Sequence, residues 1–380
     1  MTRTLRVLVA DDSPFVGQLL TSYLEAPGDM EVVAVETDGA RAVDATRRLR
    51  PDVVTLDMEM PHCNGLEALR TIMAECPTPC VVISGASGRG ATMTLQALDS
   101  GAVDFVLKYQ PGQHLDPDQL RHEIVAKVRA ASKIRVVRNV GLADRPNAVQ
   151  SPSGPPAPGS TVPRPRAVGE ALDRVVIVGA STGGPLALRR LLESLPSDFG
   201  AAMVIVQHMP ASFTGVLAAQ LDRSVPLPVR EAEDGDALEP GTVFVAPGGR
   251  HLLCEASGHV RLRRGAAIGG HCPSIDVAMQ SAARAFGHRA AGLVLTGMGS
   301  DGAKGLLAIH AEGGLTLAQD EATCVVYGMP KRAMELGVVD HQSDIPGMVQ
   351  RLLVAPPAST PGQSIPGPTA DLTAPGRSLP

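Results

Sequence analysis

Short apolar segments alternate with amphipathic helical stretches five times between residue 1 and about residue 132. Each segment has the length of a strand that is buried on both faces, and each following stretch repeats its apolar residues with a helical period. This alternation predicts a doubly wound (βα)5 unit, an open parallel sheet covered by helices on both sides. The predicted strands are RVLVA, EVVAV, DVVTL, PCVVIS and DFVLK.

The alternating pattern stops and then restarts further along the chain. Residues 133–170 are rich in Pro, Gly and Ser without an apolar period, which predicts an extended linker. A second, larger α/β domain is expected over 171–354, with a mostly parallel sheet and, near 226–264, β-rich sequence typical of antiparallel hairpins. Residues 355–380 are again rich in Pro, Gly and Ser, so a disordered tail is expected.

Composition narrows the functional classes. The 380 residues suffice for two cores, and no apolar run approaches the ~20 residues that span a bilayer. The first residues enter a strand pattern without a secretory signal, so a cytoplasmic protein that is not membrane-inserted is expected. A net charge of -5, with no Trp, disfavours a nucleic-acid partner. The six cysteines lack a paired zinc-binding spacing and are interpreted as reduced thiols.

Polar side chains follow four of the five strands predicted in the first unit. Because the carboxyl ends of parallel strands share one edge, these side chains should line one pocket. Clustered carboxylates favour a hard cation such as Mg²⁺, and a carboxylate beside it can attack a phosphoryl donor. An Asp after a strand is often only a helix cap, but this combination is more specific. The residues are Asp11, Asp12, Asp57 as the predicted phosphoacceptor, Ser84 and Lys108.

Three strand ends in the second unit each carry one member of a Ser/His/Asp set. Ser181 lies in GASTG, which fits the G-x-S-x-G turn that exposes a nucleophilic serine. Backbone N–H groups of the helix beginning near Gly184 can hold an oxyanion. His208 and Asp301 follow two other strands and are predicted to act as general base and orienting acid. The order Ser, His, Asp differs from that of α/β-hydrolases, which argues against that fold.

Simpler explanations exist for each residue alone. Ser181 can cap a helix, His208 can be a core histidine, and Asp301 can support a turn. Their joint occurrence at one predicted sheet edge favours catalysis. A nucleotide-binding domain is the rival, opposed by the G-x-x-x-G-G spacing and by Gln207-His208 where an acid is expected. Zinc hydrolysis is disfavoured because no recognised metal spacing includes the remaining histidines, among them His251, His271 and His288.

With these residues, the first unit (4–130) resembles bacterial response-regulator receiver domains. The resemblance implies that Asp57 is phosphorylated and that Mg²⁺ is held by Asp11, Asp12, Asp57 and the backbone carbonyl of Glu59. It also implies that Ser84 and Lys108 sense the phosphoryl group and that Phe105 is the aromatic switch residue. The family usually has Pro after the lysine, commonly with a cis bond, where this chain has Tyr109. A cis bond before a non-proline residue costs ~3 kcal/mol, so a different turn geometry is expected there.

A receiver followed by GASTGG, QHMP, APGGRH, CPSID, LTGMGSDGA and QDEATCVVYGMP is similar to the chemotaxis protein-glutamate methylesterases. The resemblance implies a phosphorylation-regulated hydrolysis of glutamate methyl esters on chemoreceptors, with deamidation of certain receptor glutamines, and no cofactor for the esterase step. It assigns nucleophile, base and acid to Ser181, His208 and Asp301, and support of the site to Thr182 and the backbone amide of Met298.

The resemblance also implies partners. Methyl-accepting chemoreceptors are the expected protein substrates, a sensor histidine kinase is the expected phosphodonor, and the chain is expected to be a monomer. Ser300 stands where the family usually has Asn before the aspartate, a small change. A signalling adaptor that has lost catalysis is the alternative, and the intact Ser181, His208 and Asp301 argue against it.

Overall fold

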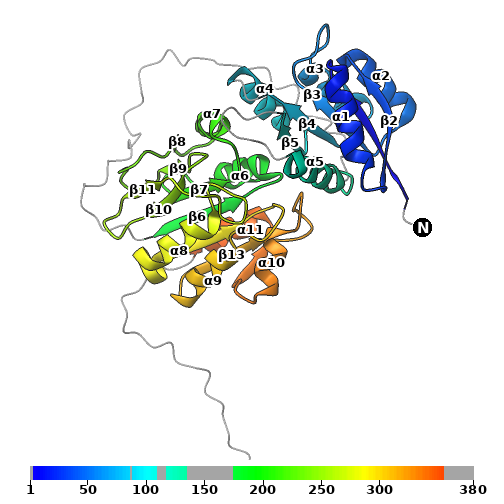
Figure 1. Cartoon of the computed structure of the whole chain (residues 1–380). Helices are drawn as coiled ribbons and strands as arrows, with labels where there is room; N and C mark the ends of the chain where they lie inside the picture. Colours follow the sequence, from blue (N-terminus) through cyan, green and yellow to red (C-terminus); the bar gives the residue numbers. More distant parts are fainter. Residues whose placement is uncertain (1–2, 86–87, 109–116, 135–173, 355–380) are drawn as a thin grey trace, which may run out of the picture.

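The computed structural model of the chain describes residues 3–85, 88–108, 117–134 and 174–354. Two helix-covered sheets are visible in it, the first built from the N-terminal residues and the second from the C-terminal ones (Figure 1). Nearly all of the predicted linker and the whole predicted tail lie outside the described residues. Within the described ranges, no helix is both long and apolar enough to cross a membrane.

The first unit is the predicted (βα)5 fold. Its five strands are all parallel and have the order β2-β1-β3-β4-β5. The elements are β1 (Leu5–Ala10), α1 (Pro14–Glu25), β2 (Met30–Glu36), α2 (Gly39–Leu49), β3 (Val53–Asp57), α3 (Gly65–Glu75), β4 (Cys80–Ser84), α4 (Gly88–Asp99), β5 (Asp104–Leu107) and α5 (Pro117–Ala131).

Alternation along β1 shows how the sheet is covered on both sides. Val7 and Val9 pack into a core shared with α1 and α5, while Leu8 and Ala10 point to the opposite face, toward α2 and α3. All four side chains are buried, as expected when a parallel sheet has helices on both faces. Burial on both faces explains why the strands are continuous apolar runs.

The second unit contains a seven-stranded parallel sheet with the order β14-β13-β12-β6-β7-β9-β8. Its elements are β6 (Val175–Ala180), α6 (Gly184–Glu193), β7 (Ala202–Gln207), α7 (Ala211–Asp222), β8 (Val229–Glu231), β9 (Val243–Val245), β10 (His251–Cys254), β11 (Val260–Arg263), α8 (Ile275–Phe286), the 3-10 helix η1 (Gly287–Arg289), β12 (Ala290–Val294), α9 (Ala303–Ala311), β13 (Leu315–Gln319), α10 (Met329–Glu335), β14 (His341–Ser343) and α11 (Ile345–Val354).

The region 226–264 is only partly antiparallel. β10 and β11 form the expected hairpin, but β8 and β9 extend the large sheet in parallel register. All three residues of β9, including Phe244, are fully buried, so β9 needs cover on both faces. A parallel position beside β7 supplies that cover, whereas an isolated hairpin leaves one face open to water.

The two units contact each other through α4 and β5 of the first and α6 and α7 of the second. The ring of Phe105 on β5 stacks on Phe213 of α7 with centroids 4.8 Å apart. Asp99, at the end of α4, pairs with Arg189 of α6 at 2.8 Å and accepts a hydrogen bond from Gln220 of α7. The contact therefore joins a buried aromatic pair to a polar rim.

Candidate active site and phosphoacceptor pocket

The register of the second sheet places Ser181 and His208 side by side. Ala180 of β6 pairs with Gln207 of β7, so the next residue on each strand is Ser181 or His208. Neighbouring strands lie about 4.8 Å apart. β12, whose following loop carries Asp301, flanks β6 on the other side. The connections that leave β6 and β12 run in opposite directions, to β7 and to β13. The three predicted residues thus follow strands at this switch point, the usual ligand site of such sheets.

Two glycines close to Ser181 are needed for different reasons. Gly183 has a φ of 74°, and a Cβ added there would lie 2.5 Å from the Cβ of Val325. A Cβ at Gly179 would lie 2.4 Å from the side chain of Ile275. Gly183 therefore permits the sharp turn into α6, whereas Gly179 lets the first residue of α8 pack against β6.

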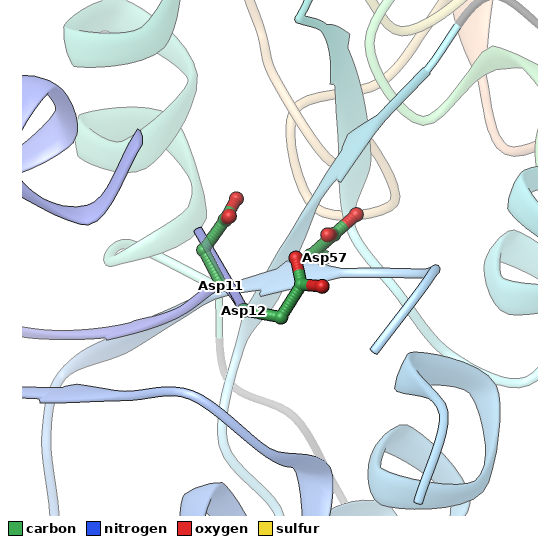
Figure 2. Close-up of side chains that lie close together, drawn as sticks. All are labelled: Asp11, Asp12 and Asp57. Carbon is green, nitrogen blue, oxygen red and sulfur yellow. The ribbon is translucent and has the colours of Figure 1, made fainter. Parts of the chain in front are cut away.

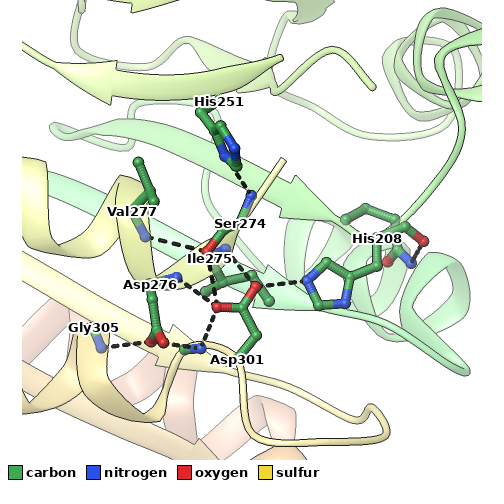
Figure 3. Close-up of polar contacts among 10 residues, drawn as sticks. His208, His251, Ser274, Ile275, Asp276, Val277, Asp301 and Gly305 are labelled. Atoms are coloured by element: carbon green, nitrogen blue, oxygen red, sulfur yellow. Dashed lines mark hydrogen bonds and ion pairs between the residues drawn. The ribbon is translucent and has the colours of Figure 1, made fainter. Parts of the chain in front are cut away.

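His208 is held by Asp301 through one ring nitrogen. Its Nε2 lies 2.9 Å from Asp301 Oδ2, and each of the two side chains is only 7% exposed (Figure 3). His208 Nδ1 is buried and has no hydrogen-bond partner within the described part of the chain. In the familiar triad the acid holds Nδ1, whereas here it holds Nε2. Nδ1 is the nitrogen left to accept a proton.

The Asp301 carboxylate is an acceptor for many donors besides His208. It accepts hydrogen bonds from the backbone N–H groups of Ile275 at 2.8 Å and Asp276 at 2.9 Å, and from Ser274 Oγ at 3.0 Å. Burial alone raises its pKa, but the hydrogen bonds from His208 and Asp276 outweigh burial and lower the pKa to about 2. Asp301 is therefore a carboxylate at neutral pH.

The N-terminus of α8 supplies most of these donors. Ser274 caps the helix by accepting from Val277 N at 3.4 Å, and its own hydroxyl donates to Asp301. The amide of Ser274 donates in turn to Nδ1 of the buried His251 at 3.2 Å. The sequence suggests only the cap, because the donation to Asp301 depends on how α8 packs beside β12.

A second acid repeats this arrangement one helix further on. The carboxylate of Asp276 accepts from Gly302 N at 2.8 Å and Gly305 N at 2.7 Å, at the start of α9 (Figure 3). Asp301 thus lies at the N-terminus of α8, the helix that contains Asp276, and Asp276 lies at the N-terminus of α9, the helix that follows Asp301. Free N–H groups at both positions favour negative charge. This exchange fixes the loop that holds Asp301.

Gln207 links the two strand ends and was not anticipated from the sequence in this role. Its Nε2 donates to the carbonyl oxygens of Ser181 at 3.0 Å and His208 at 3.2 Å. The two residues predicted to support the site lie nearby. Thr182 is buried next to Ser181, and Met298 follows Gly297, where a Cβ would lie 2.7 Å from Ser181 Cβ.

A third histidine completes the surroundings of His208. The ring of His271 stacks on the ring of His208 with centroids 3.7 Å apart and an interplanar angle of 5°. Burial and the neighbouring His208 lower the pKa of His271 to about 4. From the sequence, His271 is notable only for lacking a metal-binding spacing, since nothing in a linear pattern signals a ring stack.

The first unit contains the predicted acidic pocket. Carboxylate oxygens of Asp11, Asp12 and Asp57 all lie within 4.8 Å of one another (Figure 2). Lys108 Nζ lies 2.7 Å from both Asp11 and Asp57. Burial raises the pKa of Asp11. Burial acts to lower the pKa of Lys108, but its hydrogen bonds to the two acids outweigh that effect and raise it. Hard oxygen donors in this arrangement suit Mg²⁺.

The remaining receiver residues lie around this pocket. The Ser84 hydroxyl is buried at the end of β4 and donates to the carbonyls of Gly85 and Gly90, so it points toward α4 and not to Asp57. The amide of Glu59 donates to Asp57 Oδ1 at 3.3 Å. Phe105 is buried against Phe213 of the second unit. Tyr109, where a changed turn is expected, lies outside the described residues.

Comparisons with known proteins agree with both halves of the fold. The family model for the response regulator receiver domain matches residues 7–122, and the model for CheB methylesterase matches residues 176–352. A protein-glutamate methylesterase/protein-glutamine glutaminase of Oleidesulfovibrio alaskensis is 41% identical, with 92% of this chain and 99% of that protein covered. One from Symbiobacterium thermophilum is 43% identical, with 88% and 92% covered.

Solved structures match each half separately. The Thermotoga maritima CheB methylesterase catalytic domain is 40% identical, with a TM-score of 0.46, and the match covers 47% of this chain and 97% of that one. The response regulator domain of Thermotoga maritima CheB is 41% identical, with a TM-score of 0.33, and the match covers 35% of this chain and 99% of that one. Given near-complete coverage of relatives at about 40% identity, this chain belongs to the CheB methylesterase family, with an N-terminal receiver domain.

Proposed function

We propose that the chain is a phosphorylation-regulated serine esterase that removes methyl groups from glutamate methyl esters on chemoreceptors, with deamidation of receptor glutamines as a second activity. The observation that carries the proposal is His208, whose Nε2 is held by an ionised Asp301 while its buried Nδ1 has no hydrogen-bond partner among the described residues. The strand register places the backbone of His208 next to that of Ser181. An imidazole held in this way can act as a general base through Nδ1. The curated names of the relatives supply the substrate class.

In the first half-reaction, Ser181 Oγ attacks the ester carbonyl carbon while its proton moves to His208 Nδ1. Asp301 stabilises the resulting imidazolium through Nε2–H. The backbone amide of Met298 and the neighbouring Thr182 support the oxyanion of the tetrahedral intermediate. Collapse of the intermediate breaks the carbon–methoxy bond, and His208 returns the proton so that methanol leaves.

In the second half-reaction, His208 Nδ1 takes a proton from water, and the hydroxide attacks the acyl carbon. The carbon–Oγ bond then breaks, Ser181 recovers its proton, and the glutamate side chain is released. With a glutamine substrate, the same acyl-enzyme forms as ammonia departs. The esterase step uses only side chains and backbone amides of this chain.

The receiver accepts the regulatory phosphoryl group on Asp57 from a sensor histidine kinase. The carboxylate oxygen of Asp57 attacks the phosphorus, and the donor leaves. Asp11, Asp12, Asp57 and the backbone carbonyl of Glu59 would hold Mg²⁺, which when bound neutralises charge on the phosphoryl oxygens. Lys108, already 2.7 Å from Asp57, adds a second positive charge, and Ser84 senses the new group after turning from α4.

Regulation acts through the contact between the domains. Phe105, the proposed switch residue, stacks on Phe213 in the helix that begins three residues after His208. In the unphosphorylated state the receiver covers the approach to Ser181, and phosphorylation of Asp57 shifts the pair to an open arrangement. The domains are assigned as 4–130 and 171–354, joined by the linker 133–170 and followed by the tail 355–380. The chain acts as a cytoplasmic monomer.

Methanol release from methylated receptor membranes tests the activity. Ser181→Ala should lower turnover by about 10⁴-fold or more, because the nucleophile is lost. The variant should also lose labelling by a fluorophosphonate while keeping its thermal unfolding midpoint. A folded Ser181→Ala protein with most of the esterase activity would rule the proposal out.

The covering model, in which the unphosphorylated receiver covers the approach to Ser181, is tested by comparing three esterase rates. Full-length protein is assayed with and without a small phosphodonor and compared with a fragment that starts near Leu172. The unphosphorylated protein should be the slowest and the fragment the fastest, because the fragment has no covering domain. Equal rates in all three would defeat the model while leaving the esterase assignment intact.

A further inference from the structure

His271 lies in the segment between β11 and α8, and its ring stacks on that of His208, the proposed general base. The backbone of His271 exchanges two hydrogen bonds with Ile268, at 3.0 and 3.1 Å. The carbonyl of the next residue, Cys272, accepts from Gly249 N at 2.9 Å. The segment is thus anchored on both sides of the ring that stacks on His208. A side chain held so closely parallel to its neighbour has little freedom to turn away.

Three contacts restrain His208: the hydrogen bond to Asp301, the strand pairing of its backbone and the stacked ring of His271. Asp301 holds Nε2 in the ring plane, and the strand register holds the backbone beside Ser181. Neither contact prevents the ring from tilting about the line to Asp301. A second ring stacked on one face does prevent tilting, because sliding or turning loses the face-to-face contact.

The stack also affects the charge that forms during catalysis. When Nδ1 takes the serine proton, His208 becomes an imidazolium with an aromatic face against it, a favourable arrangement for a cation. The arrangement requires His271 to be neutral, because two stacked imidazolium rings repel. Burial favours the neutral form of His271, and the other charged groups that act on it are Asp301, Glu123 and Lys127.

We infer that His271 is a positioning residue for the esterase reaction, whose stacked ring holds the His208 imidazole in the orientation in which Nδ1 can take the Ser181 proton and stabilises the imidazolium form. The inference rests on the proposed function. It requires a flat aromatic ring at this position and does not require a hydrogen-bonding or titrating nitrogen. That distinction separates positioning by stacking from general structural support.

The test compares His271→Phe with His271→Gln in the full-length, phosphodonor-activated protein. The Phe variant keeps a flat ring, whereas the Gln variant has a similar length and polarity without one. His271→Gln should lower kcat by about 10- to 100-fold with less than about a twofold change in KM, a part of what a well-placed general base contributes. His271→Phe should keep kcat within about threefold of the parent. A Gln variant as fast as the parent, or a Phe variant as slow as the Gln variant, would overturn the inference.

A spectroscopic measurement keeps the inference testable if a variant folds poorly. The carbon-bound ring protons of His208 in the unmodified protein should show an upfield ring-current shift in proton NMR, assigned with His208→Gln. Absence of this shift would show that the rings do not stack in solution and would refute the inference. Failure of the proposed function itself looks different, since Ser181→Ala would then retain activity whatever the result at His271.

Discussion

Replacing Asp301 by Asn tests the central part of the site, because the exchange removes a charge with almost no change in shape. Asp301 Oδ1 accepts from Ser274 Oγ, Asp276 N and Gly302 N, so the Asn oxygen should take that position. The Asn NH2 group then replaces Oδ2, where it faces His208 Nε2 and the amide of Ile275. An NH2 group donates to Nε2 and therefore forces the proton of a neutral His208 onto Nδ1.

A proton on Nδ1 removes the general base, and the lost carboxylate no longer stabilises the imidazolium. We expect kcat to fall by about 10⁴-fold, equivalent to about 5 kcal/mol of transition-state stabilisation. The measurement is initial-rate methanol release by the phosphodonor-activated protein at pH 7.5, with thermal unfolding to verify the fold. A folded Asp301→Asn protein that retains a tenth of the parent activity would refute the assigned roles of the two nitrogens.

Asp276→Asn is the matched control. Asp276 also lies at a helix N-terminus, where it is partly buried, but its carboxylate binds Gly302 N and Gly305 N and does not contact His208. Burial raises the pKa of Asp276, so a neutral side chain is tolerated better there than at Asp301. We expect the control to lower stability more than activity, with kcat within about tenfold of the parent.

Asp301 also predicts the response to acid. Its folded pKa of about 2 lies below the ordinary value of 3.8, so its contribution to stability is fully present above about pH 4. That contribution, about 2 kcal/mol at one pKa unit per 1.36 kcal/mol, is lost as the pH falls through the folded pKa. Urea unfolding of the parent between pH 5 and 2 should show the loss, and Asp301→Asn should show less of it. If the free energy of unfolding fell equally with pH in the parent and in Asp301→Asn, the low pKa assigned to Asp301 would be contradicted.

Three further outcomes are expected. Asp57→Asn should abolish stimulation by a small phosphodonor while leaving basal methanol release within about twofold, and stimulation that persists would place phosphorylation elsewhere. Ser274→Ala removes a helix cap and a donor to Asp301, so urea unfolding should show a free energy of unfolding that is lower by about 1–2 kcal/mol. An unchanged free energy of unfolding would argue that Ser274 does not both cap α8 and hold Asp301. Gly183→Ala places a Cβ at positive φ and 2.5 Å from Val325, so both stability and activity should fall, and an unchanged midpoint would contradict the packing.

Local pattern predicts most of the architecture. Buried parallel strands need apolar side chains on both faces, so β1 and β6 are readable as apolar runs, and polar residues directly after them mark one sheet edge. The same logic fails at β9. Its three residues, Val243–Val245, are too short a run to reveal whether the partner strand is parallel or antiparallel, and only packing beside β7 decides.

The candidate site shows a similar division. Ser181, His208 and Asp301 are recognisable because strand ends of one sheet must converge, although their catalytic roles stay predictions. The strand pattern does not show that α8 delivers its N-terminus to Asp301, that Asp301 binds Nε2 rather than Nδ1, or that His271 covers the ring. Gly179 illustrates the reason, since its small size serves Ile275, a residue 96 positions away, and not the serine turn.

The amino-acid sequence by itself determined the two α/β units, the edge of each sheet that carries chemistry, and the residues gathered there, because hydrophobic period and strand-end position are local properties. Tertiary structure alone decided which nitrogen of His208 binds Asp301, which donors hold Asp301 ionised, and that Phe105 of the receiver contacts Phe213 beside the candidate site. These features depend on how helices pack over the sheets. Such packing joins side chains far apart in sequence, whose pairing no local pattern records.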